Sequence, residues 1–157
     1  MQFEQVVDID RSAEEVFAYL ADWTNIPSWN YYVQQVRKLT PGAVAVGTVY
    51  EQVRRTDRQR FQVIAHEPSQ TIEVATLRGE RPSFRRRLEL RSENGGTRVH
   101  DFWELDTGHP SVVQRLSAAR VRAAVGENLG LLKQLLEHGR AQLQDGRIVA
   151  LDTNRRD

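Results

Sequence analysis

Cysteine is absent from this chain of 157 residues, and only two lysines and one methionine occur. The lack of cysteine excludes disulfides, zinc–thiolate sites and thiol nucleophiles, and it suits a reducing compartment. No apolar run approaches the roughly eighteen residues of a membrane-spanning helix. The start, MQFEQVVDID, has neither the basic nor the apolar part of a signal peptide. We therefore expect a cytoplasmic protein without an integral membrane segment.

An excess of charge of one sign is also absent, since 22 basic residues face 21 acidic ones. No overall field then favours nucleic acid, and the clusters RRTDRQR and RRR suit solvated strand faces. The four histidines lack metal-ligand spacing, and there is no P-loop, dinucleotide or Gly-x-Ser-x-Gly motif. We expect no metal, no cofactor and no nucleic-acid partner.

The first two thirds of the chain read as a strand, two short helices and then more strands. Residues 3–9 alternate as a strand does, and Ser12 with Glu15 forms a capping box for a short helix. A second short helix surrounds Pro27. Over residues 31–107, turn signals predict six antiparallel strands, because strands this close together leave no room for parallel crossovers. The breaks lie at 40–47, 55–59, 66–70, 78–82 and 92–97.

A helical period follows, from GHPS at 108–111 to about Gln144. Its apolar residues form one stripe, comprising Val121, Val125, Leu129, Leu132, Leu136 and Leu143. A sheet must curl around this helix to bury the stripe. The predicted fold class is α+β, a helix-grip fold with a curved seven-stranded antiparallel sheet around a long C-terminal helix. We assign residues 1–145 to one domain and 146–157 to a flexible tail.

The hairpin FRRRLELRSENGGTRVHDFWEL places two charges on an apolar face. A tight turn at its Asn-Gly sets Arg86 opposite Trp103 and Leu88 opposite Asp101, on a face that we predict points inward. Charges are costly to bury unless they are paired. Arg86 and Asp101 either neutralise each other and fix the register, or anchor a polar group of a ligand.

The preceding hairpin, FQVIAHEPSQTIEVATL, has a similar pattern. We predict that Phe61, Val63 and Ala65 face inward, opposite Thr76, Val74 and Ile72 on the next strand, which leaves His66 and Glu73 on the other face. For GTVYEQVRR the pattern does not decide between a Val49/Val53 face and a Tyr50/Gln52/Arg54 face, so Tyr50 is only a candidate for the inner face.

An aromatic cluster at residues 22–33, DWTNIPSWNYYV, holds two of the three tryptophans and two of the four tyrosines. Trp23 and Trp29 either fill the core or form walls for a flat or greasy ligand. Tyr31 and Tyr32 begin a strand on opposite faces, and we take Tyr32 as the inward one.

Two glycines lie one turn apart on the long helix, where glycine is unfavourable. Gly126 and Gly130 either bring the helix close to the sheet or leave space for a ligand, unless they are simply tolerated.

The segment VDIDRSAEEVFAYLADWTNIPSWN resembles the opening of the START/Bet v 1-like superfamily, also called SRPBCC, in its polyketide cyclase/dehydrase branch. VGT at 46–48, EP at 67–68, GGTRV at 95–99 and the long last helix extend the resemblance over residues 3–144. The superfamily includes lipid and polyketide binders, aromatase/cyclases and coenzyme Q-related chaperones. The resemblance implies a ligand-binding domain with an internal hydrophobic cavity.

The sequence thus leaves three hypotheses. The first is binding or transport of a small hydrophobic or amphipathic molecule, lipid-like or polyketide-like, by a monomer or homodimer. The second is a polyketide cyclase, aromatase or dehydratase with Arg86 and Asp101 as catalytic candidates. The third is a protein-interaction module on the same fold. The predicted ligand-binding residues are Trp23, Trp29, Tyr32, Tyr50, Phe61, Phe84, Arg86, Asp101, Trp103, Gly126 and Gly130.

Overall fold

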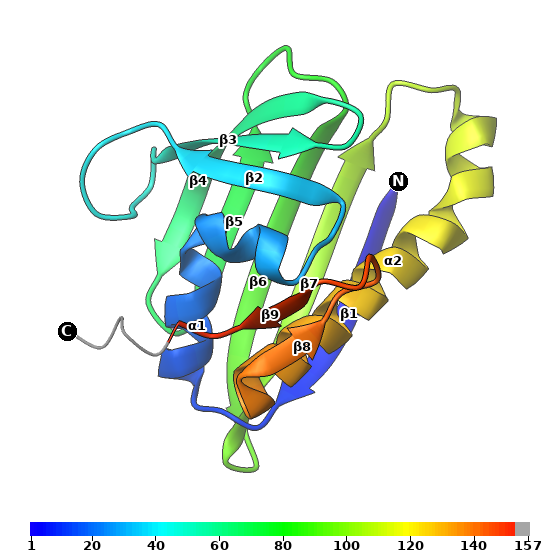
Figure 1. Ribbon diagram of the computed structural model, residues 1–157. Coiled ribbons are helices and arrows are strands. Elements are labelled where there is room, and N and C mark those ends of the chain that lie inside the picture. Colours follow the sequence, from blue (N-terminus) through cyan, green and yellow to red (C-terminus); the bar gives the residue numbers. More distant parts are fainter. Residues whose placement is uncertain (153–157) are drawn as a thin grey trace.

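Seven antiparallel strands form a single curved sheet in the computed structural model, which describes residues 1–152 (Figure 1). The spatial order is β1-β7-β6-β5-β4-β3-β2, so every neighbouring pair except β1 and β7 is consecutive in the chain. The strands are β1 (Gln2–Ile9), β2 (Val33–Lys38), β3 (Val49–Arg54), β4 (Arg58–Glu67), β5 (Thr71–Thr76), β6 (Ser83–Glu93) and β7 (Gly96–Asp106). This confirms the predicted α+β helix-grip fold.

Two short helices follow β1, as the sequence predicts. The α-helix α1 (Ala13–Ala21) begins at Ser12, whose hydroxyl accepts a hydrogen bond from the Glu15 backbone N–H at 3.2 Å. The second, η1 (Trp23–Ser28), is a 3-10 helix that begins at Asp22. Together they cover the inner face of the sheet and place both tryptophans of the aromatic cluster in the core.

The long helix α2 (Ser111–His138) ends about six residues earlier than predicted, at His138 before Gly139 rather than near Gln144. Gly139 has a φ of +75°, the left-handed conformation that closes helices and that glycine adopts without strain. Leu143 extended the apolar period of the sequence without being helical. The buried residues of α2 are Val125, Leu129, Leu132, Leu135 and Leu136, all in its C-terminal half, which packs against β1.

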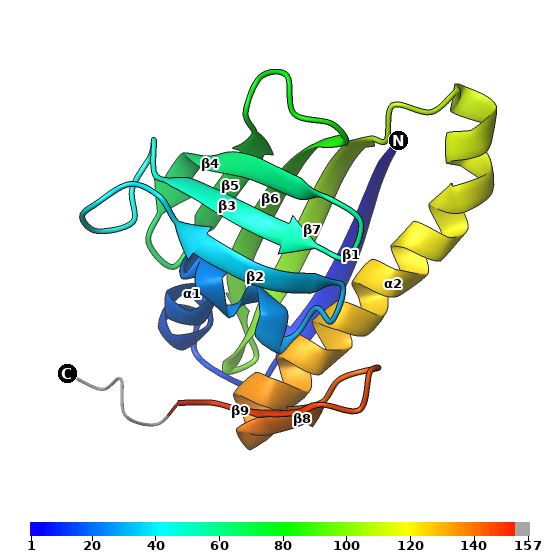
Figure 2. The same cartoon turned by 45° about the horizontal axis from the view of Figure 1, so that its top comes forward.

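A small hairpin follows α2, made of β8 (Arg140–Gln142) and β9 (Ile148–Ala150). The expectation of a loose tail over 146–157 is therefore wrong for 148–150, and Leu151 also packs against the core. Residues 153–157 lie outside the described part. The hairpin lies beside the C-terminal half of α2 (Figure 2).

The register of β6 and β7 is the predicted one, with Arg86 opposite Trp103 and Leu88 opposite Asp101. The preceding hairpin matches up to Val63, after which a bulge shifts the pairing. The bulge corrects two predictions: Ala65 pairs with Glu73 and lies on the outer face, whereas His66 lies on the inner face, where its ring contacts Phe17 at 5.3 Å between centroids. Glu73 lies on the outer face as expected, paired with Arg85.

Within residues 1–152, no helix is both long enough and apolar enough to cross a membrane. The core lies between the inner face of the sheet, α1, η1 and the C-terminal half of α2. By contrast, the N-terminal half of α2 stands clear of the sheet in both views (Figures 1 and 2). The end of the sheet that carries Phe3, Phe84 and Trp103 is accordingly only partly covered.

Candidate functional site

Arg86 and Asp101 form a bidentate ion pair at the centre of the inner face. The Arg86 Nε and Nη2 atoms donate to the two Asp101 carboxylate oxygens at 2.8 and 2.7 Å. The side chains are 6% and 0% exposed, so neither charge has substantial contact with water. A pair of this kind is neutral overall, and its mutual attraction offsets the cost of removing two charges from solvent.

All three tryptophans of the chain surround the Arg86 guanidinium. Its carbon lies 4.6 Å from the ring centroid of Trp103, 5.2 Å from Trp29 and 5.9 Å from Trp23. Cations over indole rings are attracted by the ring quadrupole, most strongly where water is excluded. We call Arg86, Asp101 and these three tryptophans the Arg86 cage. It joins the two regions that the sequence pointed to separately, the aromatic cluster and the charged hairpin.

A row of aromatic rings crosses the inner face of the sheet beside the cage. Neighbouring centroids lie between 5.4 and 6.0 Å apart, in the order Phe3, Trp103, Phe84, Phe61 and Tyr50. Phe61 and Tyr50 are fully buried, whereas Phe3, Phe84 and Trp103 are only half-buried. The row is therefore closed at the η1 end and open toward the free half of α2.

Three buried polar atoms in this region have no hydrogen-bond partner among the described residues: Trp23 Nε1, Tyr50 Oη and Trp103 Nε1. Such atoms are rare in folded proteins because each unpaired group costs about 1–3 kcal/mol. Burial raises the pKa of Tyr50 to about 12 and the nearby Asp22 carboxylate adds to the shift, whereas the Trp23 backbone N–H, which lies close to the hydroxyl oxygen, opposes it and leaves the hydroxyl proton without an acceptor. The Tyr50 hydroxyl therefore stays neutral at physiological pH and can donate a hydrogen bond.

Two buried glutamines extend the polar part of the inner face. The Gln52 amide donates to the Gln59 side-chain oxygen at 2.8 Å, and Gln59 in turn donates to the Pro82 carbonyl. The structure thereby places the Tyr50/Gln52 face of β3 inward, a choice that the sequence left open. The sequence pattern placed Gln59 in a hairpin tip. The one indication that it faces inward is its position two residues before Phe61 on β4, which puts both side chains on the same face.

Three predicted ligand-binding residues lie away from this region. Tyr32 is 37% exposed and its hydroxyl bonds to Thr56, so the prediction that it faces inward is wrong. The inward position is taken by Val33, where β2 begins two residues later than expected. Gly130 is exposed with open space around it, and Gly126 lies against the side chain of Gln5.

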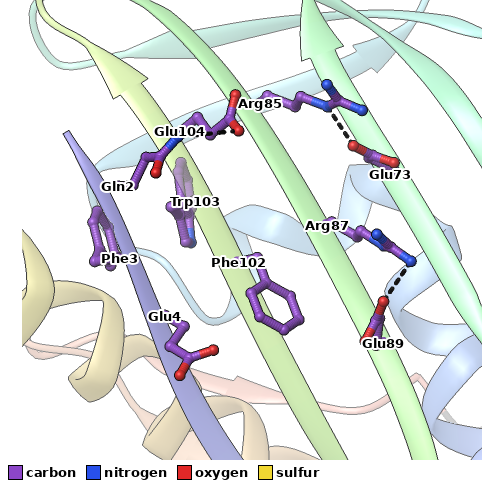
Figure 3. A pocket seen from close by; sticks show the side chains of 10 residues that line it. All are labelled: Gln2, Phe3, Glu4, Glu73, Arg85, Arg87, Glu89, Phe102, Trp103 and Glu104. Atoms are coloured by element: carbon purple, nitrogen blue, oxygen red, sulfur yellow. Dashed lines mark hydrogen bonds and ion pairs between the residues drawn. The ribbon is translucent and has the colours of Figure 1, made fainter.

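A separate hollow of about 500 Å³ lies on the outer face of the sheet, over β5, β6, β7 and β1 (Figure 3). Phe102 is at its centre, and ion pairs such as Arg85–Glu73 and Arg87–Glu89 line it. These carboxylates and guanidinium groups already satisfy one another. The hollow is on the opposite side of the sheet from the Arg86–Asp101 ion pair, although Phe3 and Trp103 of the aromatic row also line it.

No cluster of three or more histidine, aspartate or glutamate side chains suited to a metal occurs within residues 1–152. The inner face thus offers uncharged hydrogen-bond donors next to an ion pair whose charges cancel. Aromatic rings surround both.

Residues 1–137 match the family model described as polyketide cyclase/dehydrase and lipid transport. The chain belongs to this family. Its members are described by two activities, one catalytic and one of transport, so membership alone does not choose between them. A search of curated proteins gave no match.

Solved structures support the same fold. A Deinococcus radiodurans protein, DR_A0006, is 18% identical with a TM-score of 0.65, over 88% of this chain and 99% of its own. The Aha1 dimer of Colwellia psychrerythraea is 19% identical with a TM-score of 0.66, over 90% and 99%. The di-domain aromatase/cyclase StfQ of steffimycin biosynthesis is 15% identical with a TM-score of 0.66, over 86% of this chain and 44% of StfQ.

Proposed function

We propose that the protein binds a small hydrophobic or amphipathic molecule, lipid-like or polyketide-like, against the inner face of its sheet. The observation that carries this proposal is the set of three unpartnered donors around the Arg86 cage. A chain gains nothing in stability from burying such groups, so a ligand that accepts their hydrogen bonds explains their presence. The partly open Phe3, Phe84 and Trp103 provide the route of entry.

The chemistry of the donors narrows the ligand class. An indole N–H only donates, and Tyr50 keeps its proton, so the ligand has to supply acceptor oxygens. Asp101 already neutralises Arg86, so the site has no spare positive charge for an isolated carboxylate. Carbonyl or enol oxygens on a flat, apolar skeleton suit the donors and the aromatic row together.

The second candidate is a cyclase, aromatase or dehydratase that folds a reactive chain in the same place. Neutral donors aimed at a developing enolate could stabilise it, which favours this candidate. Asp101 is a poor proton carrier for such a reaction, because both of its oxygens accept from Arg86 and it is fully buried. Catalysis would therefore rest on Tyr50 and the indoles rather than on the Arg86–Asp101 pair.

Native mass spectrometry of the purified protein, with organic extraction of what it carries, tests the proposal. We expect a co-purifying apolar molecule with carbonyl or enol oxygens, bound less well by the Trp103→Phe variant. Release of the same molecule after incubation supports a carrier, whereas release with loss of water supports a dehydratase. An apo mass for fresh protein, with no uptake of hydroxynaphthoquinones, would falsify the binding proposal and favour a protein-interaction module.

Two broader expectations accompany the proposal. We place the protein in the cytoplasm, and we expect it to hold its ligand as a monomer or homodimer. The solved Aha1 protein of Colwellia psychrerythraea is a dimer, at 19% identity to this chain. Light scattering of the ligand-bound protein measures the oligomeric state directly.

A further inference from the structure

The first half of α2 has an apolar stripe on the side that faces away from the sheet. Val112, Leu116, Ala119 and Ala123 recur at spacings of four, three and four, and all four are exposed. Val112 is 65% exposed and Leu116 is 80% exposed, among the highest values for large apolar side chains here. The sheet-facing stripe, which includes Val125 and Leu129, is separate. The first half of α2 has no buried residue, because the buried residues of this helix begin at Val125, so the fold leaves the outward stripe uncovered.

Positive charge flanks the outward stripe. Arg115 and Arg122 lie along one border and Arg120 along the other, as the helical period of 3.6 residues requires. There is no aspartate or glutamate from residue 107 to residue 126. In the described part of the chain, none of these three arginines makes an ion pair, although many strand arginines do. The chain is nearly neutral overall, so this is a local concentration of unpaired charge.

The charges decide which partner suits the stripe. A second copy docked through the same stripe would bring its arginines against these, and like charges at such an interface repel. The apolar stripe needs an apolar environment and the flanking arginines need negative charge. The headgroup region of an anionic bilayer offers both, because its phosphates lie directly over the hydrocarbon chains. Basic amphipathic helices are typical of proteins that bind to the surface of such membranes.

We propose that residues 111–126, the docking segment, bind peripherally to a membrane with anionic headgroups. Val112 and Leu116 insert among the headgroups, while Arg115, Arg120 and Arg122 contact phosphates. Near the end of the segment, the Gln5 side chain donates to the Arg122 carbonyl at 2.9 Å and ties the helix to β1. This hydrogen bond anchors the C-terminal end of the docking segment to the sheet. The proposal needs no ligand on the inner face, so it can fail or succeed independently of the function proposed above.

The absence of cysteine permits a direct test. Leu116→Cys and, as a control, Val46→Cys each give one exposed thiol for an environment-sensitive fluorophore, since Val46 is 64% exposed on a distant loop. With vesicles of equimolar phosphatidylglycerol and phosphatidylcholine, we expect a blue shift at position 116 and none at 46. Vesicles of phosphatidylcholine alone should give a much weaker shift.

Other occupants give different results. A shift at 116 that grows with protein concentration without vesicles, and is not increased by them, would overturn the proposal in favour of self-association. A shift with polyglutamate but not with anionic vesicles would overturn it in favour of an acidic protein partner. No shift under any of these conditions would also overturn it.

A matched pair of triple variants separates local from overall charge. Changing Arg115, Arg120 and Arg122 to glutamine should lower partitioning onto the anionic vesicles by about 100-fold, at roughly fivefold for each arginine near the surface. Arg58, Arg78 and Arg91 are exposed on the strands and loops, and their change to glutamine alters net charge equally. Equal losses in the two variants would contradict a specific docking segment. Circular dichroism establishes that both variants are folded.

Discussion

Arg85 and Arg86 are adjacent in the chain but lie on opposite faces of the sheet, and both pair with a carboxylate. Arg85 is 54% exposed and its bond to Glu73 holds the pKa of the guanidinium above its ordinary value. Arg86 is 6% exposed, beside a fully buried Asp101. On the outer face, water can replace Glu73 as the partner of the exposed Arg85, although Glu73 itself is only 11% exposed, whereas on the inner face water can replace neither partner. An arginine–carboxylate pair thus contributes little to stability on the outer face and is required on the inner one.

The largest effect should come from breaking the inner pair. Asp101→Ala leaves a buried guanidinium without a counterion, so the free energy of unfolding should fall by about 3–5 kcal/mol. Urea denaturation followed by circular dichroism measures the change. The double variant Arg86→Met, Asp101→Leu removes both charges and should recover most of the loss, because buried pairs can be replaced by apolar groups at little cost. A double variant as unstable as the single one would contradict this explanation.

A second test separates stability from binding at the same site. Tyr50→Phe removes a buried hydroxyl whose proton has no acceptor among the described residues, so we expect the free energy of unfolding to be unchanged or to rise by up to about 1 kcal/mol. Affinity for the co-purified ligand should fall roughly tenfold, the value of one hydrogen bond to a neutral acceptor. Titration calorimetry measures it. Tyr32→Phe is the control, since that hydroxyl is exposed and should affect neither quantity.

The outer pair should respond far less. Glu73→Gln removes the partner of an arginine that water already solvates, so the free energy of unfolding should change by about 1 kcal/mol or less. The same urea denaturation measures it. A loss as large as that of Asp101→Ala would show that the difference between the two faces is not one of solvation.

The smallest effect concerns pH. The Arg98 hydrogen bond lowers the pKa of the exposed Asp8 from its ordinary value of 3.8. A lowered folded-state pKa means that the stabilisation is present above pH 3.8 and is lost as the pH falls through the folded value. Thermal unfolding of the protein and of Asp8→Asn should therefore differ slightly near neutrality and converge in acid. A difference that grows on acidification would contradict this sign.

Most of the sheet could be predicted from sequence where a turn fixes the register. Asn94 and Gly95 both have positive φ, as a two-residue hairpin turn requires, and the pairing of Arg86 with Trp103 follows from it. The bulge after Val63 has no such signal, so the side of His66 could not be predicted. The sequence could place Asp101 on the inner face, but not the distance from Arg86 to Trp29, because η1 and β6 meet only in the folded chain.

The prediction for the end of α2 was wrong for a different reason, because the apolar pattern of the helix continues beyond the helix itself. Leu143 is in phase with the helix and is buried, but it lies in the β8–β9 hairpin. Gly139 marks the true end of the helix, but the prediction followed the apolar period past it. The prediction for Tyr32 was wrong for a related reason, since Tyr32 precedes β2 and the alternation of the strand does not extend to it.

The cage has a consequence for spectroscopy. Every indole of the chain lies within 5.9 Å of one guanidinium carbon, and no tryptophan stands elsewhere. The intrinsic emission of the protein is therefore a signal from a single site, without the surface background that obscures most such measurements. Any molecule that enters the inner face, or any motion that loosens it, changes the whole of that emission, and no dye has to be attached to observe it.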